Sequence, residues 1–448
     1  MEDTIVAIST SVGEGAISII RLSGHDALNI ASKVFTKDLT KVDSHTIHYG
    51  FITSNNEKID EVLVSVMKAP KTFTREDIVE INCHGGIATT NKVLEVLLEN
   101  GARLAEPGEF TKRAFLNGRI DLLEAEATMD LISSKAESAR KISINTLTGE
   151  TSNLIKNLRS ELVKIISNIE VNIDYPEYED IEVLTNESIL PDIKKFKEKL
   201  EEIIKKSEDS KVIKEGIRVG IIGRPNVGKS SLLNSLLEEE KAIVTDVPGT
   251  TRDIVEGTIV LGGITLNITD TAGIRESDDL VEMLGVTKSL KIIDSSDLVI
   301  FILNNNEELS DEEKELLNKL KDKKKIIVVN KIDLEGKLDK SLLGDYIEIS
   351  VKENIGIDKI KDEIKRLFNL GELEASDLTY MSNARSISLL GKSLNNINDA
   401  INEINNNNPI DIVELSLKES WNNLGEVIGE TYTDELLDEL FSRFCLGK

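Results

Sequence analysis

Residues 223–230 read Gly223-Arg224-Pro225-Asn226-Val227-Gly228-Lys229-Ser230, which fits the pattern of a phosphate-binding loop. The apolar run 218–222 before it and the helix-forming run 231–237 after it predict a strand, the loop and then a helix. Glycines let backbone N–H groups turn toward phosphates, and a helix N-terminus favours negative charge. Lys229 is expected to reach the β- and γ-phosphates and Ser230 a Mg²⁺ ion. The run predicts a nucleoside triphosphate site, with a chance glycine-rich turn as the alternative.

Three later motifs predict that the base is guanine. Asn330-Lys331-Ile332-Asp333 follows an apolar strand, and an Asp carboxylate there can accept from both the N1–H and the amine of guanine. Asp270-Thr271-Ala272-Gly273 lies between this motif and the phosphate loop, where Asp270 can hold Mg²⁺ through water and Gly273 can face the γ-phosphate. Ser350-Val351-Lys352 fits the last guanine-contacting turn, although its middle residue departs from the usual alanine. This order of motifs predicts a Ras-like GTPase.

Hydrolysis is expected to differ from that of Ras. Ile274 stands where Ras places the glutamine that orients the attacking water. Asn226 can hold a monovalent cation against the phosphates, or it can be a turn-forming residue after Pro225. Thr251 is expected to be the second Mg²⁺ hydroxyl, and the backbone of residues 245–250 can complete the cation site. Glu282 is either a water-positioning carboxylate or part of a solvated acidic loop.

The composition limits the other possibilities. A chain of 448 residues is long enough for about three domains. Its net charge of −26 argues against a broad basic surface, so any RNA contact must be local. No apolar run is long enough to cross a bilayer and the first residues are acidic, which favours a cytoplasmic protein without a membrane span. Its two cysteines, Cys83 and Cys445, suggest neither a disulfide framework nor a zinc site.

The organisation predicts a multidomain α/β protein. Residues 1–118 alternate short strands (4–9, 16–22, 61–67 and 78–82) with helices (27–35 and 91–100), as in an α+β domain. Apolar residues then recur at helical spacing before and after the GTPase motifs. The two stripes are Ile155, Leu158, Leu162, Ile165 and Ile169, and Leu390, Leu394, Ile397, Ile401 and Ile404. One helical domain built from both halves, with the GTPase inserted, would bury both stripes; a dimerisation coil is the alternative.

The last residues add a separate signal. Cys445 lies near the C-terminus, between the cations Arg443 and Lys448, whose charges favour a thiolate. It can be a nucleophile, or a small buried residue that packs beside Phe444.

Taken over its full length, the chain resembles the MnmE family, also called TrmE, of tRNA-modifying GTPases. The resemblance is carried by Asp3-Thr4-Ile5-Val6-Ala7, by residues 107–117, by Gly249-Thr250-Thr251-Arg252-Asp253 in the inserted GTPase, and by the terminal Phe-Cys-x-Gly-Lys. It implies a homodimer that works with a flavin-dependent MnmG (GidA) partner, in a heterotetramer, on the wobble uridine (U34) of certain tRNAs. An aminomethyl or carboxymethylaminomethyl group is placed on C5, with 5-formyl- or methylene-tetrahydrofolate as the carbon source.

The resemblance also implies site residues. The folate positions map onto Arg21, Glu80, Arg119 and Lys448. The potassium ligands map onto Asn226, Thr245, Val247 and Thr250, and Glu282 becomes the residue that orients water. Lys229, Thr251 and, as a candidate, Cys445 complete the catalytic set. The nucleotide-binding set comprises Asn226, Val227, Gly228, Lys229, Ser230, Ser231, Thr245, Asp246, Val247, Pro248, Gly249, Thr250, Thr251, Asp270, Thr271, Ala272, Gly273, Asn330, Lys331, Asp333 and Ser350.

The predicted domains are a folate-binding and dimerisation domain (1–118), a discontinuous helical domain (119–210 and 371–448) and a Ras-like GTPase domain (216–370). The expected cofactors are GTP, Mg²⁺, K⁺ and a tetrahydrofolate. One alternative is a ribosome-assembly GTPase of the Era or EngA type, which shares the phosphate loop but appends a KH-type RNA domain. Another is a folate-binding scaffold with a vestigial GTPase, which the intact nucleotide motifs disfavour.

Overall fold

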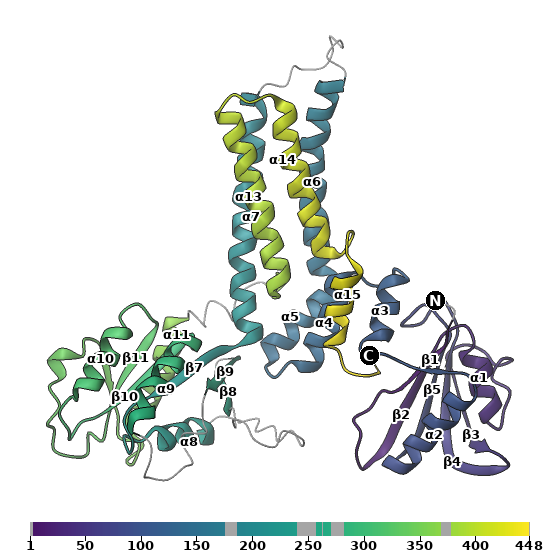
Figure 1. Ribbon diagram of the computed structural model, residues 1–448, viewed down its shortest axis with the longest axis horizontal. Helices are drawn as coiled ribbons and strands as arrows, with labels where there is room; N and C mark the ends of the chain where they lie inside the picture. Colours follow the sequence, from purple (N-terminus) through teal and green to yellow (C-terminus); the bar gives the residue numbers. More distant parts are fainter. Residues whose placement is uncertain are drawn as a thin grey trace. The chain divides into compact units, whose positions relative to one another are not determined.

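The computed structural model describes residues 3–174, 186–239, 257–261, 263–269, 282–368 and 378–447. The chain divides into two compact units, and Figure 1 labels most of their elements. The first unit comprises Met1–Met129, Ser152–Val163 and Trp421–Lys448, and the second comprises Asp130–Thr151 and Lys164–Ser420. Among the described residues, no helix combines the length and apolarity that a membrane span requires.

A six-stranded sheet organises the first unit, in the order β3-β4-β5-β2-β1-β6. Its strands are β1 (Ile5–Ile8), β2 (Gly15–Ser23), β3 (Thr46–Ser54), β4 (Glu57–Met67), β5 (Ile78–Gly85) and β6 (Arg103–Leu104). Helices α1 (Ala27–Val34) and α2 (Ile87–Glu99) pack on one face. Because side chains alternate along a strand, Ile20 and Leu22 are buried under these helices while Arg21, between them, lies on the other face.

The C-terminal segment completes this unit. Helix α3 (Glu109–Leu116) packs against α15 (Asp434–Ser442), and Phe115, Phe441 and Phe444 are buried in their common apolar cluster, which also includes the start of α4 (Leu122–Ser133). Residues from the two ends of the sequence therefore share one core.

The second unit contains a six-stranded sheet in the order β12-β11-β10-β7-β9-β8. Its strands are β7 (Ile217–Ile222), β8 (Gly257–Leu261), β9 (Ile264–Thr269), β10 (Leu298–Asn304), β11 (Lys325–Asn330) and β12 (Tyr346–Glu348), and all pairs are parallel except β8 with β9. Four helices accompany them: α8 (Lys229–Glu239), α9 (Glu282–Ser295), α10 (Asp311–Lys319) and α11 (Ile357–Leu367).

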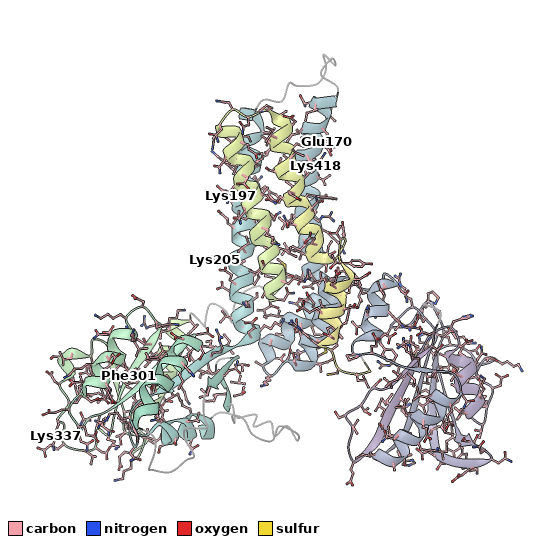
Figure 2. All side chains as sticks on the ribbon, viewed as in Figure 1. Glu170, Lys197, Lys205, Phe301, Lys337 and Lys418 are labelled. Carbon is pink, nitrogen blue, oxygen red and sulfur yellow. The ribbon has the colours of Figure 1, made fainter. Side chains whose placement is uncertain are left out.

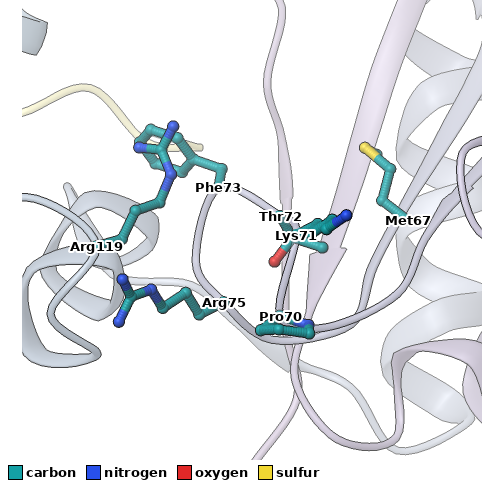
Figure 3. A pocket seen from close by; sticks show the side chains of 7 residues that line it. All are labelled: Met67, Pro70, Lys71, Thr72, Phe73, Arg75 and Arg119. Atoms are coloured by element: carbon teal, nitrogen blue, oxygen red, sulfur yellow. The ribbon is translucent and has the colours of Figure 1, made fainter. Parts of the chain in front are cut away.

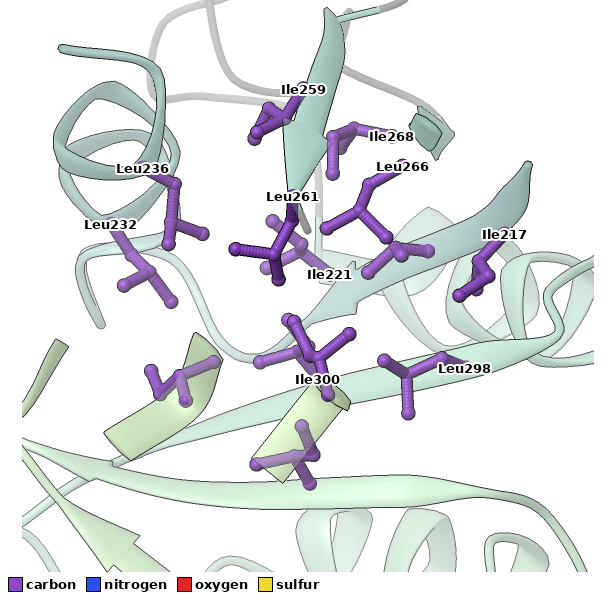
Figure 4. Close-up of a cluster of buried hydrophobic side chains, with 14 of the residues drawn as sticks. Ile217, Ile221, Leu232, Leu236, Ile259, Leu261, Leu266, Ile268, Leu298 and Ile300 are labelled. Carbon is purple, nitrogen blue, oxygen red and sulfur yellow. The ribbon is translucent and has the colours of Figure 1, made fainter. Parts of the chain in front are cut away.

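Both faces of this sheet are covered, as expected for parallel strands. Ile300 belongs to the cluster shown in Figure 4, with Ile221, Leu232 and Leu266. Phe301, the next residue of β10, is buried in a second cluster. The parallel order β7-β10-β11 brings the carboxyl ends of these strands to one edge, where ligands bind in sheets of this class.

Helices that precede this sheet in the sequence pack against helices that follow it, as predicted. Helix α7 (Asn186–Glu215) precedes the sheet in sequence and lies beside α13 (Ala384–Asn405), which follows it. The Ser393 and Ser420 hydroxyls lie 2.7 Å apart and join α13 to α14 (Ile410–Ile428). Lys418 pairs with Glu170 of α6 (Glu150–Asp174) at 2.7 Å (Figure 2). A further helix, α5 (Glu137–Leu147), contacts α7.

The predicted apolar stripes are confirmed with local shifts. In α6, Ile155, Leu158, Leu162 and Ile169 are buried, but Ile166 takes the buried position predicted for Ile165. In α13, Leu390, Ile397 and Ile404 are buried as predicted, whereas Leu394 and Ile401 are half-buried and the smaller Ser393 and Ala400 face the core instead.

Strand β3 was absent from the sequence-based prediction. Gly50 lies in its middle, and glycine normally weakens a strand. A side chain at this position would collide with Thr36 and the Phe35 ring, so glycine allows that ring to pack against the strand.

Candidate functional site

The phosphate loop has the backbone that its sequence predicts. It connects β7 to α8, and its two glycines have positive φ angles, 149° at Gly223 and 101° at Gly228. A Cβ at Gly223 would collide with the Ile302 carbonyl, and one at Gly228 with the Asn330 side chain. Both positions therefore require glycine, because of both the backbone conformation and the space.

Lys229 lies over this loop as the first residue of α8. Its Nζ donates to the carbonyl oxygens of Gly223 and Arg224, at 2.6 and 2.8 Å. Ser230 follows it half-buried, and Ser231 is exposed. The loop thus places an ammonium group and a hydroxyl at a helix N-terminus, an arrangement suited to phosphate and Mg²⁺.

Asn226 is the exposed residue at the tip of the loop. Its φ of 64° lies in the left-handed region, which asparagine tolerates better than most residues. This conformation supports the turn-forming interpretation from the sequence. Since the side chain is also exposed, the amide oxygen remains available as a cation ligand, and the two roles are compatible.

Asn330 ties the phosphate loop to the guanine motif. It ends β11, is 3% exposed, and its Nδ2 donates to the Val227 carbonyl at 2.8 Å. Its Oδ1 accepts from the backbone N–H groups of Lys331, at 2.8 Å, and Val351, at 3.2 Å. One buried amide therefore holds three predicted nucleotide-binding segments together.

Asp333 and Ser350 lie together at the same edge. The Ser350 hydroxyl donates to Asp333 Oδ1 at 2.7 Å, and this hydrogen bond is the main reason that the pKa of Asp333 is lowered. Ser350 also accepts from the Glu353 N–H at 3.3 Å. An ionised carboxylate fixed in this way is an acceptor suited to the adjacent donors of guanine.

Several predicted residues of the nucleotide site lie outside the described residues. They are Thr245, Asp246, Val247, Pro248, Gly249, Thr250, Thr251, Asp270, Thr271, Ala272 and Gly273. Glu282 begins α9, and its side chain is also outside the described part of the chain. In the parts that are described, no group of three His, Cys, Asp or Glu side chains could hold a metal ion.

Arg21 and Glu80, two of the predicted folate residues, form an ion pair on neighbouring strands. They are direct partners across β2 and β5, and Arg21 Nε donates to Glu80 Oε1 at 2.7 Å. Their side chains are 21% and 24% exposed. The Arg21 guanidinium also lies 5.7 Å from the Phe110 ring centroid. The pair thus lies on the face of the sheet opposite α1 and α2.

The C-terminal tail approaches this pair. Gly447 accepts from Arg21 Nη1 at 3.4 Å and from the Ser9 hydroxyl at 3.3 Å. Its φ is 86°, and a Cβ would collide with the Ile8 carbonyl, so the tail needs glycine to lie against β1. Lys448 lies outside the described residues but is bonded to Gly447.

Arg119 and Cys445 occupy other positions in this unit. The Arg119 guanidinium is 4.9 Å from the Phe73 ring centroid, and Phe73 packs in the same apolar cluster as Phe110. Cys445 is exposed, and its carbonyl accepts from Gly108 N–H at 3.4 Å. The alternative of a buried Cys445 is therefore wrong, because Phe444 alone turns into the core.

The sequence-based prediction missed the residues that contact the predicted folate residues. Phe73 and Phe110 support two arginines, and Gly447 carries the tail contact. The positive φ of Gly447 could have been suspected from a glycine in the terminal motif, whereas the aromatic partners gave no sequence signal.

Comparison with known proteins supplies the family. The model of the MnmE helical domain matches residues 122–445, and the model of the GTP-binding protein TrmE N-terminus matches residues 4–119. The tRNA modification GTPase MnmE of Bacillus licheniformis is 52% identical, over 100% of this chain and 100% of the relative. That of Lactococcus lactis subsp. lactis is 51% identical, over 100% of this chain and 98% of the relative.

A solved structure, the G domain of the T. maritima FeoB iron transporter, is 26% identical over 34% of this chain and 97% of that chain. Its TM-score of 0.26 is too low to support a conclusion. The full-length relatives and the two family models are sufficient by themselves: the chain belongs to the MnmE family of tRNA modification GTPases.

Proposed function

We propose that the chain is a potassium-stimulated GTPase that acts in the cytoplasm with a flavin-dependent partner of the MnmG type. Together they add an aminomethyl or carboxymethylaminomethyl group to C5 of the wobble uridine of certain tRNAs, using a folate one-carbon unit. The observation that carries this proposal is the Arg21–Glu80 pair beside the C-terminal tail, in a chain whose second unit joins the phosphate and guanine motifs.

The residues around Glu80 fit a reduced folate. A pterin presents an amine and a ring N–H side by side, and a carboxylate can accept from both. Arg21 holds the Glu80 carboxylate in place, and Arg119 keeps a cation over an aromatic surface for the carboxylates of the ligand. Lys448 follows Gly447 and would add a further cation. The folate supplies the one-carbon unit when bound.

For hydrolysis, Lys229 would hold the β- and γ-phosphates, and Ser230 and Thr251 would hold Mg²⁺. Asn226, Thr245, Val247 and Thr250 would hold K⁺, which supplies the positive charge that other GTPases obtain from an arginine. We assign water positioning to Glu282. Hydrolysis would then act as a conformational switch in a homodimer. It would shift the balance between dimer conformations that differ in access to the modification site. Cys445 is exposed and remains a candidate for the one-carbon chemistry.

The proposal can be tested by reconstituting modification. The purified chain, the flavin-dependent partner, undermodified tRNA, GTP and 5-formyltetrahydrofolate are incubated, and the nucleosides are analysed by mass spectrometry. Glu80→Gln keeps the size of the side chain but removes its charge, so folate binding should weaken about tenfold or more, for one lost charged hydrogen bond. Glu61→Gln, at an exposed position on β4, is the matched control. Undiminished modification and folate binding by Glu80→Gln would contradict the assigned site.

The ribosome-assembly alternative is not favoured. The matched family models cover the regions that flank the GTPase motifs, and the full-length relatives carry the name of a tRNA modification GTPase.

A further inference from the structure

An open pocket of about 390 Å³ in the first unit has a cationic lining (Figure 3). Seven residues line it: Met67, Pro70, Lys71, Thr72, Phe73, Arg75 and Arg119. Three of them are cations and none is an acid. Its volume lies in the range of ligand pockets. The sequence-based prediction assigned a role to Arg119 alone.

The three cations are exposed, and within the described ranges none of them forms an ion pair. The acids that follow on the same loop have other partners. Glu76 pairs with the buried Arg113 and accepts from the Ser23 hydroxyl, and Asp77 accepts from the Ala69 N–H. In a chain of net charge −26, three such cations around one pocket form a local exception to the acidic surface.

The loop that carries two of these cations has a fixed shape. Arg75 has a φ of 60°, a left-handed conformation that is unfavourable for a non-glycine residue. Its Nη1 donates to the Asn117 carbonyl at 2.9 Å, and Asn117 Nδ2 donates back to the Thr74 carbonyl at 2.6 Å. Thr72 donates to the Glu76 carbonyl at 2.6 Å. The fold therefore holds the Arg75 side chain beside the pocket.

Arg119 closes the other side. Its guanidinium lies above the Phe73 ring. The flat face of the guanidinium stacks on the ring, so the N–H donors at its edge point away from the ring. Two guanidinium groups and one ammonium group around a pocket suit an oxyanion ligand, since guanidinium binds phosphate or carboxylate in a bidentate manner.

We propose that Lys71 and Arg75, in the pocket that they share with the folate residue Arg119, form an oxyanion site that binds backbone phosphates of the tRNA. RNA is repelled by an acidic protein, so its binding requires a local group of cations that displaces counterions from the phosphates. This pocket is such a group, and it is open to a macromolecule. The inference rests on the proposed tRNA substrate. Folate carboxylates share the same chemistry and are the competing source of the anion.

The test compares two double variants of the full-length protein. Lys71→Gln with Arg75→Gln removes two pocket cations and leaves Arg119 in place. Lys33→Gln with Lys92→Gln removes the same charge from α1 and α2 of the same unit, away from the pocket lining. Binding of fluorescently labelled tRNA is measured across a series of KCl concentrations, and binding of triglutamylated 5-formyltetrahydrofolate is measured in parallel. Thermal unfolding checks that each variant is folded.

The pocket variant should bind tRNA about tenfold or more weakly at low salt, and the slope of log affinity against log salt should fall by about 2 relative to wild type. The control variant should keep most of the tRNA affinity and most of the salt dependence of the wild type. Equal effects in the two variants would overturn the inference, as would weakened binding of the triglutamylated folate with unchanged tRNA binding. Absence of tRNA binding by the wild-type protein would also overturn it, whereas modification of tRNA in the reconstituted reaction would still support the proposed function.

Discussion

Replacing Asn330 with alanine should loosen the nucleotide site before any nucleotide is bound. The variant loses the bond to the Val227 carbonyl and the two bonds that Oδ1 accepts from Lys331 and Val351. Each hydrogen bond contributes about 0.5–1.5 kcal/mol net, and the partners of a 3% exposed residue would be left without it. The free energy of unfolding of the second unit should therefore fall by about 2–4 kcal/mol.

The substitution should also weaken nucleotide binding, because part of the binding free energy would be spent on ordering the loops that Asn330 holds in the wild type. If all of the lost stability appears in binding, GDP affinity falls by about 30-fold to 10³-fold. Urea unfolding of the nucleotide-free protein and titration with a fluorescent GDP analogue measure the two effects. Asn267→Ala is the control, since Asn267 Nδ2 makes one exposed bond, to the Glu215 carbonyl at 2.9 Å. Unchanged urea unfolding of nucleotide-free Asn330→Ala would refute the reasoning, because Asn330 would then act only through the nucleotide.

Three further predictions concern separate parts of the chain. Glu282→Ala should slow GTP hydrolysis by about 10²–10⁴ in single-turnover assays, the range for lost help with proton transfer or water positioning, and an unaltered rate would remove its assigned role. Arg113→Leu should lower the free energy of unfolding by about 3–5 kcal/mol, because Arg113 is 1% exposed and the Glu76 carboxylate would lose its cation. Asp3 and Glu109 would keep their second cation, Arg103, and the exposed Arg140→Leu should cost little in the same thermal or urea unfolding. Because the pKa of Asp333 is lowered from 3.8, GDP affinity in wild type should hold at mildly acidic pH and decline only as pH falls through the lowered value. Ser350→Ala removes the hydrogen bond that is the main cause of the lowered pKa, so GDP affinity should begin to decline at a higher pH than in wild type. Superimposable pH profiles of the two proteins would contradict this.

The nucleotide site was predictable where its chemistry is local in sequence. Residues 223–230 determine their own backbone, because the two glycines with positive φ and the lysine at the helix start are neighbours in the chain. The bond from Asn330 to Val227 was not predictable in this way, since it depends on the parallel order of β7, β10 and β11. A motif indicates which residues meet a ligand, and the fold determines which motifs support each other.

The first unit shows where sequence patterns are less informative. Arg113 is charged and would be expected at the surface, yet it is buried among Asp3, Glu76 and Glu109. Arg75 has no neighbour in sequence that marks its special backbone conformation. In both cases the deciding partners lie far away in the chain or on another element, so the three-dimensional structure was needed to identify them.

The rate of GTP hydrolysis in potassium and in sodium, at equal ionic strength, tests the central claim most directly when wild type is compared with Asn226→Gly. Glycine keeps the left-handed backbone of this position and removes the whole side chain, including the amide oxygen that is the proposed potassium ligand. We predict a large increase specific to potassium in wild type, and its loss in the variant with GDP binding near normal. Equal rates in the two salts for wild type, or equal potassium stimulation in the variant, would contradict the potassium-dependent mechanism.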